Sequence, residues 1–87
     1  MPITEITISI YDENNAPVEA KINLGEEIRF ASTAIFSLED GTYDLRIEKE
    51  GYIPVFANLS IKQGENKSIT VKLYREENLA LSKSYHG

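Results

Sequence analysis

Cysteine is absent from this 87-residue sequence, and histidine occurs once, at His86. Without cysteine the chain has no disulfide framework and no thiolate zinc site, so hydrophobic packing and strand pairing must hold it together. The same absence leaves the redox compartment open. A domain of this length buries only about 60% of the surface that its unfolded chain exposes. The composition therefore indicates one small domain with a modest core.

Long apolar runs and basic runs are missing as well. No segment approaches the roughly 18 apolar residues of a membrane-spanning helix, and the N-terminus has neither the basic region nor the apolar run of a signal peptide. The net charge is −5, with eight acidic against two basic side chains in residues 1–43 and six against seven in residues 44–87. This distribution of charge gives the chain no basic surface that would bind phosphate groups. We therefore expect neither membrane insertion nor nucleic acid as a partner.

Apolar and polar residues alternate with a period of two along most of the chain, which is typical of half-buried strands. The alternation predicts inward-facing apolar sets and short strands over residues 5–11, 18–24, 28–30, 34–38, 42–48, 53–61 and 69–73. The pattern does not settle which side of segment 34–38 faces the core. Pro54 lacks an N–H, so its strand is expected to be an edge strand or to contain a bulge near its start.

Turn residues separate these strands every eight to twelve positions, as in small sandwiches and barrels. The turns are expected at 12–17, 39–41 and 63–66, where Asp, Asn, Pro and Gly gather. The sequence thus predicts an all-β fold, a seven-stranded antiparallel β-sandwich over residues 1–75, followed by a short C-terminal tail over residues 76–87.

The segment from Gly41 to Tyr52 has the pattern G-x-Y-x-L-x-I-x-K-x-G-Y. It resembles the central signature of carboxypeptidase regulatory-like domains and of the related PEGA domains, which are prealbumin-like or immunoglobulin-like sandwiches. The stretches 8–22 and 64–73 resemble the opening and the close of the same family, so the resemblance covers about residues 5–74. Each motif position has a structural role, as a turn glycine or a core residue, so the signature indicates a fold and no site.

The resemblance implies a non-catalytic accessory domain that stabilises, spaces or binds. Such domains are found beside peptidases, in bacterial cell-surface and outer-membrane proteins, and as modules on phage particles. The residues agree with this expectation, since His86 lies in a polar tail without a partner for acid–base chemistry. No serine, threonine or carboxylate belongs to a motif with a catalytic mechanism. We expect no enzymatic activity and no cofactor.

The acidic residues of two predicted turns are candidate ligands for a calcium ion. Asp12, Glu13 and Asn14 lie in one predicted turn and Glu39 and Asp40 in another. Oxygen ligands from two loops at one end of a sandwich could hold Ca²⁺, but neither loop has the glycine-punctuated calcium pattern. Acids and amides also solvate and cap turns, and no metal site is predicted.

Three aromatic residues fall on outward phases of their strands: Tyr11, Phe56 and Tyr74. If the first, sixth and seventh strands are neighbours, these rings form one interface patch. Alternatively, tyrosine tolerates half-exposure on any sheet, and Pro54 shifts the phase so that Phe56 is buried. The tail adds Leu79, Leu81 and Tyr85 as a candidate docking arm.

Two functions remain open at this stage. In the first, the chain is an auxiliary or decoration protein of a large assembly such as a bacteriophage virion, bound to a major capsid or tail protein. In the second, it is an accessory domain of a bacterial cell-surface or secreted protein, where it spaces or stabilises a neighbour or binds a ligand. Carbohydrate binding is compatible with both functions, and no residue pattern supports it.

Overall fold

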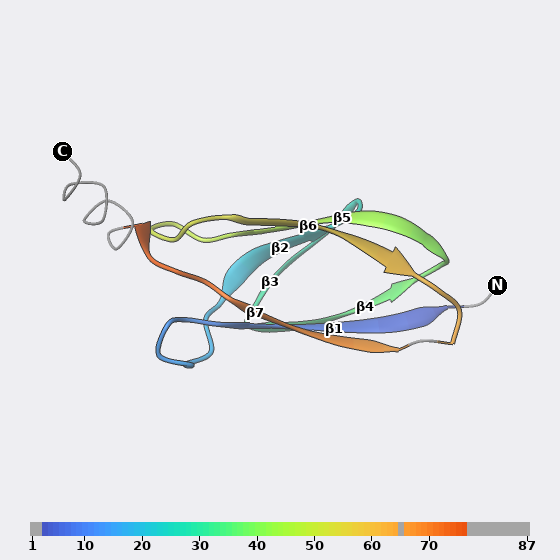
Figure 1. The fold of residues 1–87 in the computed structure, drawn as a ribbon, viewed down its shortest axis with the longest axis horizontal. Helices are drawn as coiled ribbons and strands as arrows, with labels where there is room; N and C mark the ends of the chain where they lie inside the picture. Colours follow the sequence, from blue (N-terminus) through green and yellow to red (C-terminus); the bar gives the residue numbers. More distant parts are fainter. Residues whose placement is uncertain (1–2, 65, 77–87) are drawn as a thin grey trace.

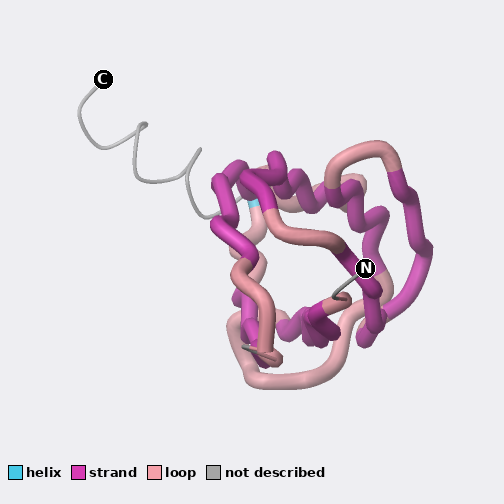
Figure 2. Tube along the Cα trace, turned by 90° about the vertical axis from the view of Figure 1, so that its right-hand side faces the viewer, coloured by secondary structure: helices cyan, strands magenta, loops and turns pink. Residues whose placement is uncertain are grey.

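The computed structural model describes residues 3–64 and 66–76, which form seven strands in two facing sheets (Figure 1). The strands are β1 (Thr4–Tyr11), β2 (Ala20–Leu24), β3 (Glu27–Ala31), β4 (Thr33–Leu38), β5 (Gly41–Glu48), β6 (Val55–Ile61) and β7 (Lys67–Lys72). Each of them overlaps a strand expected from the alternation. Seen end-on, the strands surround the interior that the core side chains fill (Figure 2).

The two sheets have the orders β4-β1-β7 and β3-β2-β5-β6. Four of the strand pairs are antiparallel, but β1 and β7 pair in parallel from Ile6↔Lys67 to Tyr11↔Lys72. The chain crosses from β6 to β7 at the end of the sandwich where β1 begins, so β7 runs in the same direction as β1. The predicted sandwich is therefore confirmed, and this one parallel pair departs from a wholly antiparallel arrangement.

Alternating side chains of both sheets meet in a single core, as the pattern predicts. The buried apolar residues are Ile6, Ile8, Ile10, Val18, Ala20, Ile22, Leu24, Ala34, Phe36, Leu38, Leu45, Ile47, Ile61 and Leu73. In β4, which had no predicted facing, Ala34, Phe36 and Leu38 point inward and Ile35 is exposed. The one buried polar residue among the described positions is Thr4, whose hydroxyl donates to the carbonyl of Lys62 at 3.0 Å.

The hairpin between β2 and β3 depends on a glycine. Leu24 pairs with Glu27, so the loop contains two residues, and Gly25 has a φ of +60° at its first position. A type II′ hairpin turn requires that conformation there. A Cβ on Gly25 would also lie 3.0 Å from Cδ2 of Tyr43. The hydroxyl of Tyr43 donates to the carbonyl of Glu39 at 2.7 Å. This hydrogen bond holds the ring against Gly25 in the β2–β3 turn.

The described chain begins and ends at opposite ends of the sandwich. β1 starts where the described chain starts, and the parallel β7 carries the chain to the other end, where Arg75 bridges to Tyr52 (Figure 1). Pro54 directly precedes β6, which is an edge strand, in agreement with one of the two expectations for that proline. Among the described residues, no helix has the length and apolar character needed to cross a bilayer.

Candidate interaction surface

The outer face of the four-stranded sheet carries exposed apolar side chains at both of its edges. On β3, Ile28 and Phe30 point outward, and Phe30 is 69% exposed. On β6, Phe56 is 68% exposed. Adjacent strands lie about 4.8 Å apart, so the two edge strands are separated by roughly 14 Å. The apolar groups of this face are therefore too far apart to form one continuous patch.

Polar side chains occupy the space between the two edges. The strand register places Ile28, Asn23, Arg46 and Phe56 in one row across the sheet. Asp44 pairs with Asn58 in the next row on the same face. We call Asn23, Asp44, Arg46, Phe56 and Asn58 the outer-face group.

The outer-face group lines a shallow depression of about 520 Å³. The Asn23 amide donates to the carbonyl of Arg46 at 3.4 Å, and the Arg46 guanidinium lies 3.4 Å from a carboxylate oxygen of Glu48, which is outside the depression. A solvated ion pair of this kind stabilises the fold by less than about 1 kcal/mol. The depression thus presents a planar ring beside amide, carboxylate and guanidinium groups, a combination suited to contacts with a polar partner surface.

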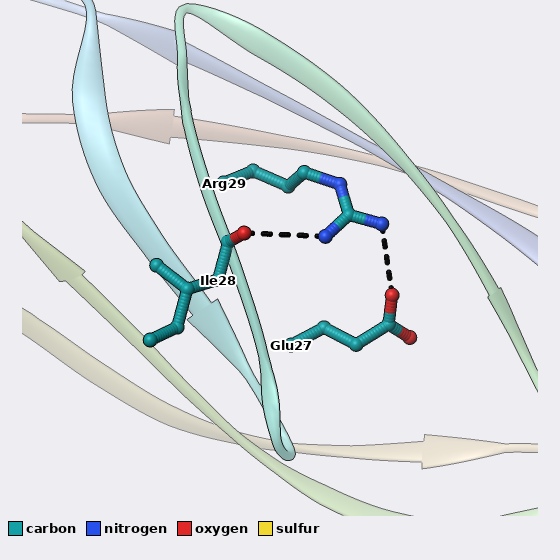
Figure 3. A network of polar contacts seen from close by, with 3 residues as sticks. All are labelled: Glu27, Ile28 and Arg29. Carbon is teal, nitrogen blue, oxygen red and sulfur yellow. Dashed lines mark hydrogen bonds and ion pairs between the residues drawn. The ribbon is translucent and has the colours of Figure 1, made fainter.

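The inner side of β3 differs from that of the other strands because its central residue is Arg29, between Glu27 and Ala31, and no large apolar side chain lies there. Arg29 donates to Glu27 at 2.8 Å and to the carbonyl of Ile28 at 3.2 Å, and Ile28 points to the other side of the strand (Figure 3). The guanidinium carbon lies 5.2 Å from the centroid of the Phe36 ring. The arginine stem and its cation–π contact therefore cover the edge of the core.

The outward aromatics predicted from the sequence do not form one patch. Tyr11 is half-buried on β1 and Tyr74 is 52% exposed just after β7, both at one end of the three-stranded sheet. Phe56 lies on the outer face of the other sheet. The alternative in which Pro54 turns Phe56 inward is also wrong, because β6 begins after the proline and keeps its phase, with Leu59 and Ile61 inside. Leu79, Leu81 and Tyr85 lie outside the described residues.

The two acidic loops lie at opposite ends of the sandwich. Leu38 pairs with Thr4 at the start of β1, which places Glu39 and Asp40 at that end, whereas the turn from Asp12 follows the end of β1. The two loops therefore cannot share a calcium ion. One carboxylate oxygen of Asp12 accepts hydrogen bonds from the backbone N–H groups of Asn14 and Ala16 at 2.8 and 3.0 Å. Its position is explained by turn capping.

Glu13, in the same turn as Asp12, also makes a structural hydrogen bond. Glu13 accepts a hydrogen bond from the N–H of Arg75 at 3.0 Å. Over residues 3–64 and 66–76, no group of three or more metal-ligating side chains is close enough to hold an ion. His86 lies beyond these residues.

The exposure of Ile28 and Phe30 was not foreseen, although the sequence contains the necessary signal. Asn23 has the outward phase of its strand, and a two-residue loop at Gly25 and Glu26 places Ile28 directly opposite Asn23. Residues opposite one another in an antiparallel pair share a face of the sheet. Combining turn length with phase would have placed both apolar residues outside.

Comparison with models of known protein families identifies the family of this chain. The PEGA domain model matches residues 6–77, well over half of the chain. The chain belongs to the PEGA domain family. PEGA domains are non-catalytic, which agrees with the expected class of function. No curated protein sequence gives a significant match.

Solved structures contain the same fold within longer proteins. A candidate membrane-associated protein of unknown function from Bacteroides fragilis matches with a TM-score of 0.68 and 22% identity, over 86% of this chain and 28% of that one. The TIE protein of Bacillus anthracis matches with a TM-score of 0.68 and 15% identity, over 85% of this chain and 17% of that one. At these identities the likeness shows the fold alone. This PEGA domain corresponds to less than a third of either protein.

Proposed function

We propose that this PEGA domain is a spacing and interaction module of a bacterial cell-surface or secreted protein. The observation that carries the proposal is the position of the chain ends. The described chain enters at the start of β1 and leaves beyond β7 at the opposite end, because the two strands are parallel. A domain with this geometry extends a polypeptide by its own length and separates whatever precedes it from whatever follows it.

The comparisons support the same setting. The fold occurs as a minor part of two longer bacterial proteins, and one of these is described as a candidate membrane-associated protein. The outer-face group supplies a surface on which a neighbouring domain or a partner protein can rest. A function as a virion decoration protein gains no support from the family or from these neighbours.

Fractionation of the source cells tests the proposal. The chain is followed with a specific antibody through cytoplasm, envelope, culture medium and particles of megadalton size. We expect it in the envelope or the medium, within a polypeptide longer than 87 residues. A cytoplasmic protein and a known envelope protein serve as markers.

Two results would overturn the proposal. Co-migration with megadalton particles in place of the envelope would favour a virion component. Recovery in the cytoplasm as a free domain would exclude a spacing role at the cell surface.

A further inference from the structure

The first and last strands of this domain are hydrogen-bonded to each other. β1 and β7 form six register pairs, from Ile6↔Lys67 to Tyr11↔Lys72. β1 is also the central strand of its sheet, since β4 pairs with it on the other side from Thr4↔Leu38 to Ser9↔Thr33. The strand by which the chain enters the domain is therefore bonded along both of its edges.

The parallel direction determines how a pull on the chain acts. Tension between the two ends draws β1 toward its start and β7 toward its end, in opposite directions along the strand axes (Figure 1). The hydrogen bonds between them are then loaded together, in shear. A pull on two neighbouring ends of the same strands would open the bonds one at a time.

Loading in shear raises the force needed to separate the strands, because water has less opportunity to replace each hydrogen bond as it breaks. A backbone hydrogen bond that opens to water costs little to break, because water replaces it, whereas one that breaks where water is excluded loses its full strength. The inner side of β1 is closed to water, since Ile6, Ile8 and Ile10 have no exposed surface. Several bonds must therefore break within one small displacement, before water can replace them.

Additional contacts fasten β1 near its start. The hydroxyl of Thr4 donates to the carbonyl of Lys62 at 3.0 Å, and the N–H of Glu5 donates to the amide oxygen of Asn66 at 3.1 Å. Thr4 is 1% exposed, so its bond is protected from solvent. Both contacts connect the first strand to the segment that leads into β7.

The far end is fastened in a similar way. The N–H of Leu73 donates to the carbonyl of Tyr11 at 2.8 Å, and the N–H of Arg75 donates to the Glu13 carboxylate at 3.0 Å. Leu73 is fully buried, so extraction of the segment after β7 also exposes an apolar side chain. The contacts at the two ends extend the β1–β7 pairing beyond its six register positions.

We propose that the β1–β7 pair acts as a mechanical clamp that keeps the domain folded when tension is applied along the chain. The function is to transmit force through a surface protein without lengthening. This inference rests on the proposed spacing function, since only a domain placed between two others experiences such a load.

Single-molecule stretching with two attachment geometries tests the clamp. The sequence has no cysteine, so an introduced pair supplies the only thiols for coupling to DNA handles. The pair Ile3→Cys and Glu76→Cys pulls along the strands from opposite ends. The control pair Ile3→Cys and Gln63→Cys pulls from one end, because residue 62 lies beside Thr4. All three positions are exposed in the native fold.

We expect the unfolding force for the opposite-end pair to be several-fold higher than for the same-end pair. Urea denaturation of the two variants without load should give the same free energy of unfolding, which excludes a difference in stability as the cause. Equal unfolding forces, or a lower force for the opposite-end pair, would overturn the proposal.

The outcome is separable from that of the fractionation experiment. A large force difference in a protein found in the cytoplasm would leave the clamp intact and remove the surface function. An envelope protein whose two attachment geometries unfold at the same force would keep the proposed function and remove the clamp.

Discussion

Replacement of Gly25 by alanine tests the close approach between the β2–β3 turn and Tyr43, which belongs to the central signature of the sequence. Gly25 has a φ of +60°, and a Cβ there would lie 3.0 Å from Cδ2 of Tyr43. Gly51 provides a matched control, since its φ is +85° but no atom lies within 4 Å of its Cβ position. Both substitutions place a Cβ at a positive φ, and only Gly25→Ala also brings that Cβ against Tyr43.

The magnitudes follow from these two terms. A residue with a Cβ is less stable by about 1–2 kcal/mol in the left-handed region than in the right-handed one. Gly51→Ala should therefore lower the free energy of unfolding by about 1–2 kcal/mol. Gly25→Ala must also displace a ring that is held by its hydrogen bond to Glu39. Overpacking typically adds about 1–3 kcal/mol, so we expect a total of about 2–5 kcal/mol. For a domain of this size, each kcal/mol corresponds to about 4–8 °C in Tm.

Urea denaturation and thermal melting of both variants provide the assay, together with a double-mutant cycle. In the Tyr43→Ala background the ring is gone, so Gly25→Ala should lower the free energy of unfolding by about 1–3 kcal/mol less than it does when Tyr43 is present. If Gly25→Ala destabilises no more than Gly51→Ala when Tyr43 is present, the close approach has no energetic consequence and the reasoning is refuted.

Three further predictions concern the core and the outer faces. Ile8 has no exposed surface, so Ile8→Ala should lower the free energy of unfolding by about 2–5 kcal/mol in urea titration; a loss below about 1 kcal/mol would contradict its place in the core. Tyr43→Phe removes the hydrogen bond to the carbonyl of Glu39 and should cost about 0.5–1.5 kcal/mol in the same assay, with no loss expected if water replaces that bond fully. Phe56→Ala and Tyr74→Ala should each change stability by less than about 0.5 kcal/mol, and a large fall in Tm would mean that these rings pack against the fold.

Period-two alternation predicts the facing of most strands because one side of each sheet is buried. The side chains of Ile6, Ile8 and Ile10 have no exposed surface, as the sequence led us to expect. The alternation failed for β3, where Ile28 and Phe30 are the outward residues. An edge strand has one paired neighbour, so a long polar side chain such as Arg29 can cover the core while its apolar neighbours face outward.

Prediction of the interface was limited by strand order. Alternation assigns Tyr11, Phe56 and Tyr74 to outward phases, and exposure follows that assignment for Phe56 and Tyr74. Alternation carries no information on which strands are neighbours, so it could not show that Phe56 and Tyr11 lie in different sheets. The same gap allowed two acidic loops at opposite ends to be considered as one calcium site.

The amino-acid sequence by itself determined the all-β class, the seven strands, most residues of the core and the family. These properties depend on local chemistry: the side-chain period of a strand, the conformations that glycine and asparagine adopt in turns, and the burial of apolar groups. Only the tertiary structure decided that β1 and β7 pair in parallel, that the chain leaves the domain opposite to where it enters, and that Phe56 lies apart from Tyr11 and Tyr74. Strand pairing brings together segments distant in the sequence, and their order depends on how the two apolar faces of the whole chain close over each other.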